Sequence, residues 1–267
     1  MFTPKTVPIR FPSGLRGEFR EMLVSEEDLI AATAGSQKSR ERATLNDRLL
    51  GACWLRITEP GPYRQKFADG KLDLGKMLIG DKSHYLVQLR VESLGDLLRF
   101  QTQCGRGHRY EAQVSLKALD LKPLTAEAAE RFAQDRLFEV RLPRTGRQVR
   151  FALLIGEDQM RVEDALTNSK DELSSELLAL RVREIEGFDL KTGLDAETNL
   201  DIRGFLKRLP TFDATALRDA IADVEPGVDL EAESTCKCGS ITTVDVTEAA
   251  TDFFLPHTRR KTSLAKS

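Results

Sequence analysis

The residues best suited to chemistry in this sequence are cysteines and histidines that gather at two short turns. The first turn reads Cys104-Gly105-Arg106-Gly107-His108 and the second reads Cys236-Lys237-Cys238-Gly239. Thiolate and imidazole groups are ligands that Zn²⁺ prefers, and a structural zinc site surrounds the ion with four of them as a tetrahedron. We therefore predict one shared structural zinc site, with the ligands Cys104, His108, Cys236 and Cys238.

The two turns correspond at a separation of 132 positions, which places Cys104 opposite Cys236. A glycine in each turn suits a metal-binding knuckle, because such a loop needs backbone conformations that other residues avoid. The match is incomplete, since Arg106 stands opposite Cys238, and His108 is taken as the fourth ligand instead. The alternative is a metal-free pair of turns whose three thiols are buried or partly buried.

Other catalytic patterns are sparse. Cys104 could act as a nucleophile with His108 as its base, but no other catalytic motif accompanies this pair. The glycines of the first turn are too few for a phosphate-binding loop and do not open a helix. Cys53, beside Trp54 in an apolar stretch, is interpreted as core filling. We therefore predict that the protein is not an enzyme and has no catalytic or organic-cofactor residues.

The composition is that of an ordinary globular chain, with 267 residues of which 40% are hydrophobic and 31% charged. No apolar run approaches the roughly 18 residues of a membrane span, so we expect no membrane partner and assembly in a cytoplasm-like, reducing compartment. Clustered cysteines there more often bind metal than form disulfides. The net charge of -2 argues against a broad nucleic-acid surface. A zinc-ribbon nucleic-acid-binding protein remains the alternative.

The elements that would position the first turn are a β-hairpin, three helices and a two-stranded knuckle. Pro12-Ser13-Gly14 is expected to form the hairpin turn, Ser25 to cap the first helix and Asp81 to cap the third. His84 is predicted to lie at the surface or at its boundary. The predicted ranges are 7–11 and 15–23 for the hairpin, 43–57 for the second helix, and 97–103 and 110–116 for the knuckle strands.

The second half repeats this order. The segment 140–146 echoes 9–14, and 177–185 echoes 49–57. Six further residues match at the constant separation of 132 positions: Asp81, Gly95, Leu98, Cys104, Gly107 and Val114 correspond to Asp213, Gly227, Leu230, Cys236, Gly239 and Val246. A long internal period of this kind indicates a duplicated module.

We therefore predict an α+β fold of two pseudo-symmetric repeated halves, joined at a zinc-ribbon-like Cys/His site. Two copies of one module can pair about a pseudo-twofold axis and bury matching surfaces. The first half-module is expected over residues 1–122 and the second, packed on the first, over 123–256. Residues 257–267 are expected to form a flexible basic tail.

The order of four segments resembles a known family. These segments read IRFPSGLRGEFREMLVSEEDL, IGDKSHYLVQLRVESLGD, RLPRTGRQVRFALLIGEDQ, and CKCGS ahead of DFFLP. Together they span nearly the whole chain, from about Ile9 to Pro256, and their order is more specific than any one of them. In this order they are similar to the baseplate and tail-assembly proteins of T4-like contractile phages.

The resemblance implies a structural or assembly component of the virion tail baseplate, near its central hub. The implied partners are other baseplate, hub, spike or tape-measure proteins, and no catalytic residue is implied. Family members commonly show Cys-x2-Cys-type knuckles at both turns, matched here by Cys104 in the first and by Cys236 and Cys238 in the second. The closing segment 253–256 (FFLP) would either contact a partner or cap the core.

Overall fold

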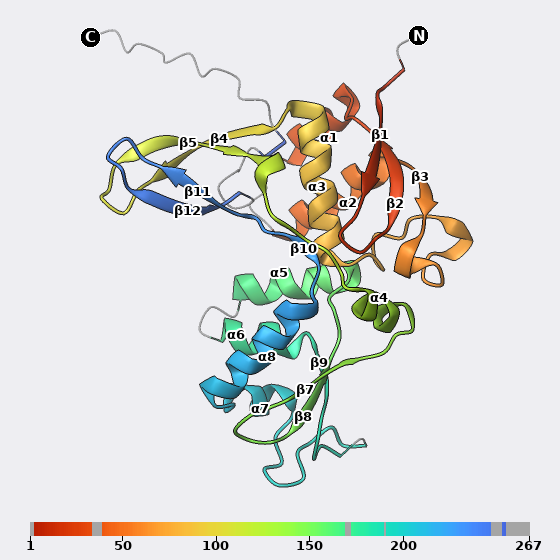
Figure 1. Cartoon of the computed structure of the whole chain (residues 1–267), viewed down its shortest axis with the longest axis vertical. Helices are drawn as coiled ribbons and strands as arrows, with labels where there is room; N and C mark the ends of the chain where they lie inside the picture. The colour runs from red at the N-terminus through yellow and green to blue at the C-terminus, as the bar shows by residue number, and fades with distance from the viewer. Residues whose placement is uncertain (1–2, 34–38, 169–171, 190, 247–252, 255–267) are drawn as a thin grey trace.

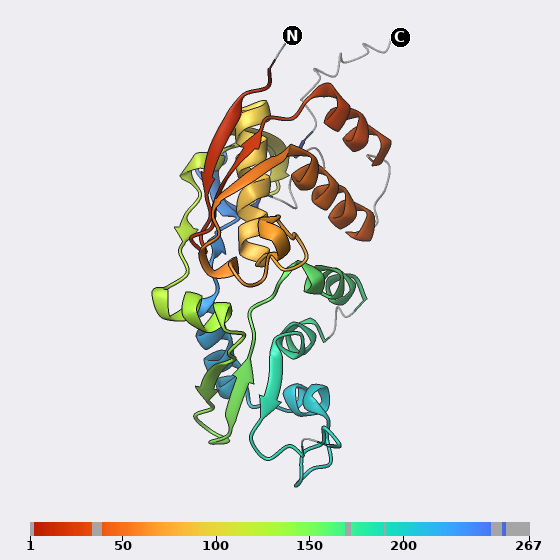
Figure 2. The same ribbon diagram turned by 90° about the vertical axis from the view of Figure 1, so that its right-hand side faces the viewer.

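Two bodies and a projecting arm make up the protein. The computed structural model describes residues 3–33, 39–168, 172–189, 191–246 and 253–254. The bodies are stacked one above the other in both Figure 1 and Figure 2, and the arm extends sideways from the upper one. Helices and antiparallel sheets occur in both bodies, which confirms the expected α+β class.

The upper body contains a three-stranded antiparallel sheet and three helices. Its sheet has the order β1-β2-β3. The strands are β1 (Thr6–Arg10), β2 (Arg16–Arg20) and β3 (Trp54–Glu59), and the helices are α1 (Val24–Thr33), α2 (Ser39–Cys53) and α3 (Ile79–Leu94). Short 3-10 turns follow at Gly61–Tyr63 and Ala68–Gly70.

The hairpin β1–β2 forms because apolar residues alternate along it and a glycine closes it. Phe11 and Phe19 point into the core and are at most 2% exposed. Gly14 has a φ of +93°, which is open to glycine but strained for other residues. The expected turn at residues 12–14 is confirmed.

Asp81 does not cap α3, as the sequence suggested, because that helix begins at Ile79 after Leu78. One carboxylate oxygen of Asp81 accepts the backbone N–H of Ser13 at 3.0 Å, and the other accepts the Tyr63 hydroxyl at 2.7 Å. The side chain therefore ties the hairpin turn to α3.

Three other local predictions for this body were wrong. The helix expected over 43–57 ends at Cys53, and the following residues pair with β2 as strand β3. Ser25 lies inside α1, where the Glu26 carboxylate accepts the Leu23 N–H at 2.7 Å. His84 is buried rather than at the surface, with its ring edge against Phe11, and burial lowers its pKa to about 4.

The lower body contains a second three-stranded sheet of the same order, β7-β8-β9, with helices packed around it. The strands are β7 (Phe138–Arg141), β8 (Gln148–Phe151) and β9 (Val182–Ile185). The helices are α5 (Gln159–Asn168), α6 (Leu173–Ala179), α7 (Ile202–Lys207) and α8 (Thr211–Val224), with a 3-10 turn at Gly156–Asp158. Helix α4 (Ala126–Ala133) lies against the Gly61–Tyr63 turn of the upper body, and a 3-10 turn at Leu116–Ala118 contacts α3 at the base of the arm.

The arm consists of two β-hairpins from distant parts of the chain, which lie side by side in Figure 1. They are β4 (Leu97–Gln103) with β5 (Arg109–Ser115), and β11 (Glu231–Thr235) with β12 (Ile241–Asp245). Their inner faces share a small hydrophobic core that includes Leu98, Phe100 and Val244, and Val87 of α3 closes this core at the arm's base. The predicted knuckle strands of the first half are confirmed to within a residue. A two-residue ladder between β6 (Leu121–Lys122) and β10 (Gly227–Val228) lies beneath the arm.

Two details of the upper body recur in the lower one. The register between the second and third strand shifts before Gly17 and again before Phe19 in the upper body, and before Phe151 in the lower body, 132 positions after Phe19. The Asp213 carboxylate accepts the backbone N–H groups of Arg144 at 2.7 Å and Thr145 at 3.0 Å, as Asp81 accepts that of Ser13. In each body an aspartate therefore holds the turn that joins the first two strands of the sheet.

The main hydrophobic core contains buried residues of both bodies and of the segment that follows the arm. Phe254 is 8% exposed and belongs to this core, and Arg90 donates to the carbonyl oxygen of Phe253 at 2.7 Å. This segment thus caps the core as far as it is described. The division at residues 122 and 123 stays a prediction, and the tail 257–267 lies outside the described residues. No described helix is both long and apolar enough to span a bilayer.

Candidate metal centre

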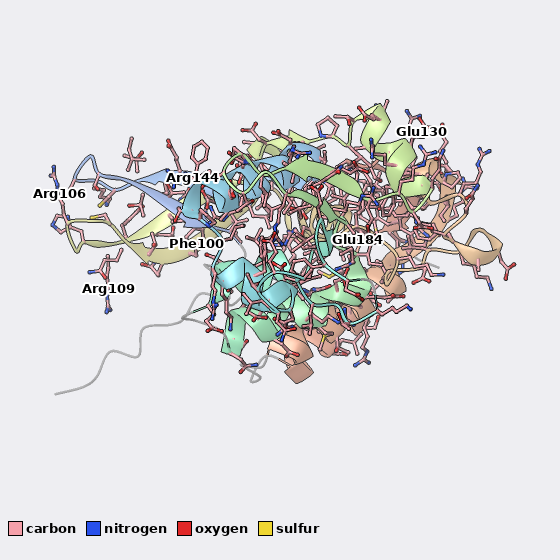
Figure 3. All side chains as sticks on the ribbon, turned by 90° about the horizontal axis from the view of Figure 1, so that it is seen from below. Phe100, Arg106, Arg109, Glu130, Arg144 and Glu184 are labelled. Atoms are coloured by element: carbon pink, nitrogen blue, oxygen red, sulfur yellow. The ribbon has the colours of Figure 1, made fainter. Side chains whose placement is uncertain are left out.

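The four predicted ligands meet at the free end of the arm. Arg106 and Arg109 mark this end in Figure 3. One ligand atom from each of Cys104, His108, Cys236 and Cys238 can be chosen so that all four lie within 4.8 Å of one another. The Cys104 sulfur is 3.8 Å from His108 Nδ1 and 3.8 Å from the Cys238 sulfur. Folding thus brings together turns that are more than 130 residues apart.

These spacings fit a tetrahedral ion. Zinc–sulfur bonds of about 2.3 Å place neighbouring ligand atoms about 3.8 Å apart at the corners of a tetrahedron. The separation of the Cys104 and Cys238 sulfurs has that value, and the separation of the Cys104 sulfur from His108 Nδ1 is within a few tenths of an ångström of the shorter edge that a zinc–nitrogen bond of about 2.0 Å gives. Three thiols and one imidazole also match the softer donors that select Zn²⁺ over Mg²⁺ or Ca²⁺. The residues present therefore fit a zinc ion in number, type and spacing.

The two turns have the same backbone structure, which explains how the cysteines come to face each other. The Cys104 N–H donates to the His108 carbonyl at 3.0 Å, and the Cys236 N–H donates to the Ser240 carbonyl at 2.9 Å. Gly107 and Gly239 have φ values of +83° and +82°. Each hairpin therefore ends in a tight loop that requires a glycine and points its first cysteine inward.

Hydrogen bonds around the cluster favour the ionised form of two thiols. The hydrogen bond from His108, followed by that from the Ser240 backbone, lowers the pKa of Cys238 to about 6. Desolvation raises the pKa of Cys104, but the backbone amides of Arg106 and His108 outweigh it, and the net shift is downward. The His108 pKa is raised by its bonds to Cys238 and then Cys104. Thiolates are the form that binds metal, so the loops prepare the site for a cation.

Arg106 occupies the position in the first turn that corresponds to Cys238 in the second turn, so the first turn has one thiol fewer. Its guanidinium donates to the Cys238 carbonyl at 3.4 Å and so bridges the two loops. His108, two residues further along, places a nitrogen in the cluster as a possible fourth donor. A second bridge runs from the Tyr110 hydroxyl to the Ser234 carbonyl at 3.3 Å, and no sequence pattern indicated it.

Cys53 is not part of this cluster. It lies at the end of α2 with no exposed surface, and burial raises its pKa to about 11. Its thiol therefore stays protonated. This agrees with its interpretation as core filling.

Comparison with known proteins identifies the family. The chain matches the model of the T4 bacteriophage base plate protein family over residues 6–255, nearly its whole length, and it belongs to that family. No curated protein and no solved structure matches it. Membership implies a location in the virion tail, with other baseplate proteins as partners, and favours a structural role over a catalytic one. It gives no support to the alternative of a nucleic-acid-binding protein.

Proposed function

We propose that this protein is a structural or assembly component of the central hub region of a contractile tail baseplate, rigidified by one structural Zn²⁺. The ion would be held by Cys104, His108, Cys236 and Cys238. The observation that carries the proposal is that ligand atoms of these four groups lie within 4.8 Å of one another, at the end of an arm built from two distant segments. The partners would be hub, spike, tape-measure or other baseplate proteins, and assembly would take place in the host cytoplasm.

A metal cross-link between the two loops would stabilise the arm, because the hydrophobic core of the arm is small. Its apolar cluster extends from Val87 and Val91 of α3 outward along the hairpins, and the loops beyond Thr102 and Ser234 contribute few buried apolar side chains. When bound, zinc supplies a cross-link between the two loops. Structural zinc contributes directly to folding free energy, so it would hold the arm's end in one conformation. A rigid projection suits a protein that must join neighbours in a fixed arrangement.

We further propose that the two halves descend from one duplicated module. The paired register shifts and the paired roles of Asp81 and Asp213 support this, because such details are unrelated to each other and yet recur at matched positions. Under this proposal the metal centre lies where equivalent hairpins of the two modules meet.

The metal is tested by elemental analysis of the full chain purified without added zinc. We expect about one zinc per chain, and loss of most of it in Cys236→Ser, since four ligands hold the ion. The variant Cys53→Ala is the matched control, because it also removes a buried thiol but leaves the cluster intact. A stable wild-type protein without zinc, or equal zinc in both variants, would contradict the site.

The location is tested in infected cells. Antibody against the chain should label the tail baseplate or a tail-assembly intermediate, and crosslinking should recover hub, spike or tape-measure proteins. If the chain is absent from both purified virions and assembly intermediates, the proposed role is wrong.

A further inference from the structure

The two outer faces of the arm differ in chemistry. Because side chains alternate along a strand, the residues opposite to the shared core face outward on each hairpin. On the first hairpin the exposed outward residues are Leu97, Arg99, Gln101, Gln103, Arg109, Glu111 and Gln113. On the second they are Glu231, Glu233, Thr235, Ile241 and Thr243, with Asp229 just below them. The first face carries two arginines, three amides and one carboxylate (Glu111), whereas the charged groups of the second face are all carboxylates.

Four of the charged side chains on these faces have no ionic partner in the part of the chain that the structure describes. Among the residues that the structure describes, the side chains of Arg99, Arg109, Glu231 and Glu233 take part in no ion pair. Arg99 and Glu231 also occupy matched positions of the two halves, 132 residues apart, so the sign of the charge is reversed there. Each face further exposes one large apolar side chain, Leu97 at 51% and Ile241 at 62%.

Because the hairpins pack core to core, their outer faces look in opposite directions. The basic face of one copy can therefore meet the acidic face of another, while each copy keeps its second face free. Contact of this kind is heterologous, and it produces a ring if the rotation closes. Like faces, in contrast, would bring charges of the same sign together.

The positions along the hairpins favour antiparallel arms. Leu97 lies at the base of its hairpin, whereas Ile241 lies at the tip of the other, next to the loop. Antiparallel arms bring these two side chains together. They also bring Arg99, near the base, opposite Glu233, and Arg109, at the tip, opposite Asp229, while Glu231 comes opposite Gln101 and Glu111. Parallel arms would instead place Arg109 beside Ile241 and Leu97 beside Asp229.

We propose that the arm is a self-association surface, in which the β4–β5 face of one copy binds the β11–β12 face of a second copy with the arms antiparallel. A seven-residue strand is about 23 Å long, and two strands are about 10 Å wide. Such a face covers about 230 Å², below the roughly 800 Å² that each partner of a standard interface buries. A single contact is therefore weak and salt-sensitive. This proposal goes beyond the proposed function and does not depend on the bound ion, so the two can fail separately.

The test is sedimentation velocity of the full chain over a range of concentrations. In about 0.05 M salt the wild-type sedimentation coefficient should rise with concentration, and about 0.5 M salt should abolish the rise, because exposed charges are then screened. The variants R99E/R109E and E231K/E233K should each weaken association by about tenfold or more. All four residues are exposed, so both variants should fold like the wild type by circular dichroism.

Mixing the variants gives the decisive result. R99E/R109E has two acidic faces and E231K/E233K has two basic faces, so an equal mixture should associate although neither does alone. The variant K71E/R218E is the matched control, since it makes the same change in net charge as R99E/R109E at exposed sites away from the arm, and it should associate like the wild type. A wild-type chain that is monomeric in low salt, or a mixture that stays monomeric, would overturn the proposal and assign these faces to a different protein.

Discussion

Asp81 and Asp213 perform the same task in different electrostatic surroundings. Burial raises the pKa of Asp81 to about 6, despite its hydrogen bonds from Ser13 and Tyr63. Burial also acts on Asp213, but the backbone amides of Arg144 and Thr145 outweigh it and lower its pKa. The difference follows from burial, which prevails at Asp81, and from the kind of donor, since two backbone amides bind Asp213 whereas one amide and one hydroxyl bind Asp81.

Asp81→Asn tests the first of these environments. A carboxyl group whose pKa is raised by folding adds stability that is complete below its unfolded pKa of about 4 and is lost as pH rises through about 6. Asparagine removes this dependence. We therefore expect the unfolding free energy of Asp81→Asn, relative to wild type, to increase between about pH 4 and pH 7 in urea titrations.

Asp213→Asn should behave in the opposite way. Its lowered pKa means that the carboxylate stabilises the fold above its unfolded pKa of about 4, and this stability is lost as the pH falls. We expect the variant to lose about 1–3 kcal/mol at neutral pH, the usual range for hydrogen bonds to a charged group, and less in acid. The same pH dependence in both variants would show that the two carboxyl groups do not differ as described.

The fourth proposed ligand, His108, can be replaced by a cysteine at position 106, which lies opposite Cys238 when the two turns are aligned. His108→Ser alone should weaken zinc binding more than about tenfold, measured by competition with a chromophoric chelator. Adding Arg106→Cys should restore binding, because Arg106 lies opposite Cys238 and a thiol there would enter the cluster from the equivalent point. If the double variant binds no better than His108→Ser, the equivalence of the two loops is wrong.

At the scale of the elements, the glycine-closed loops determine whether the cysteines face each other. Gly107→Ala and Gly239→Ala should each destabilise the arm by about 1–2 kcal/mol, since both residues have φ above +80° and other residues are strained there. Gly105→Ala is the matched control, because Gly105 lies in the same loop without positive φ and with no atom near its added carbon. Hydrogen exchange along β5 and β12 measures the effect, and equal exchange in all three variants would contradict it.

The sequence predicted which four residues meet at the end of the arm, because cysteines and histidines are rare in this chain. Four cysteines and three histidines occur in the whole chain, so their recurrence at two glycine turns is easy to recognise. The hairpin of the upper body and the knuckle strands were also predictable, since turn residues and alternation are local signals.

What the sequence could not predict depended on distant partners. The apolar residues of the stretch 49–57 satisfy helical spacing, and only pairing with β2 makes its last part a strand. Asp81 resembles a helix cap because it lies near a helix start, yet the groups that it binds are 68 and 18 residues away. The burial of His84 likewise results from packing against Phe11. Such contacts exist only once the chain is folded.

At the scale of the whole molecule, the arm joins a hairpin from the first part of the chain to a hairpin from its last part. Each half contributes one hairpin and one loop, and an ion at the end would join them. Removal of zinc by a chelator should therefore increase hydrogen exchange in β4, β5, β11 and β12, while the sheet β7-β8-β9, which has its own packing, should be unaffected. An equal increase in that sheet would mean that the ion supports the whole fold instead of the arm.

The central claim, that one zinc ion joins two distant loops, is tested most directly by zinc-edge X-ray absorption on the purified full chain. We predict a first shell of three sulfur atoms at about 2.3 Å and one nitrogen at about 2.0 Å. A shell of oxygen and nitrogen without sulfur, or the absence of stoichiometric zinc, would contradict the account.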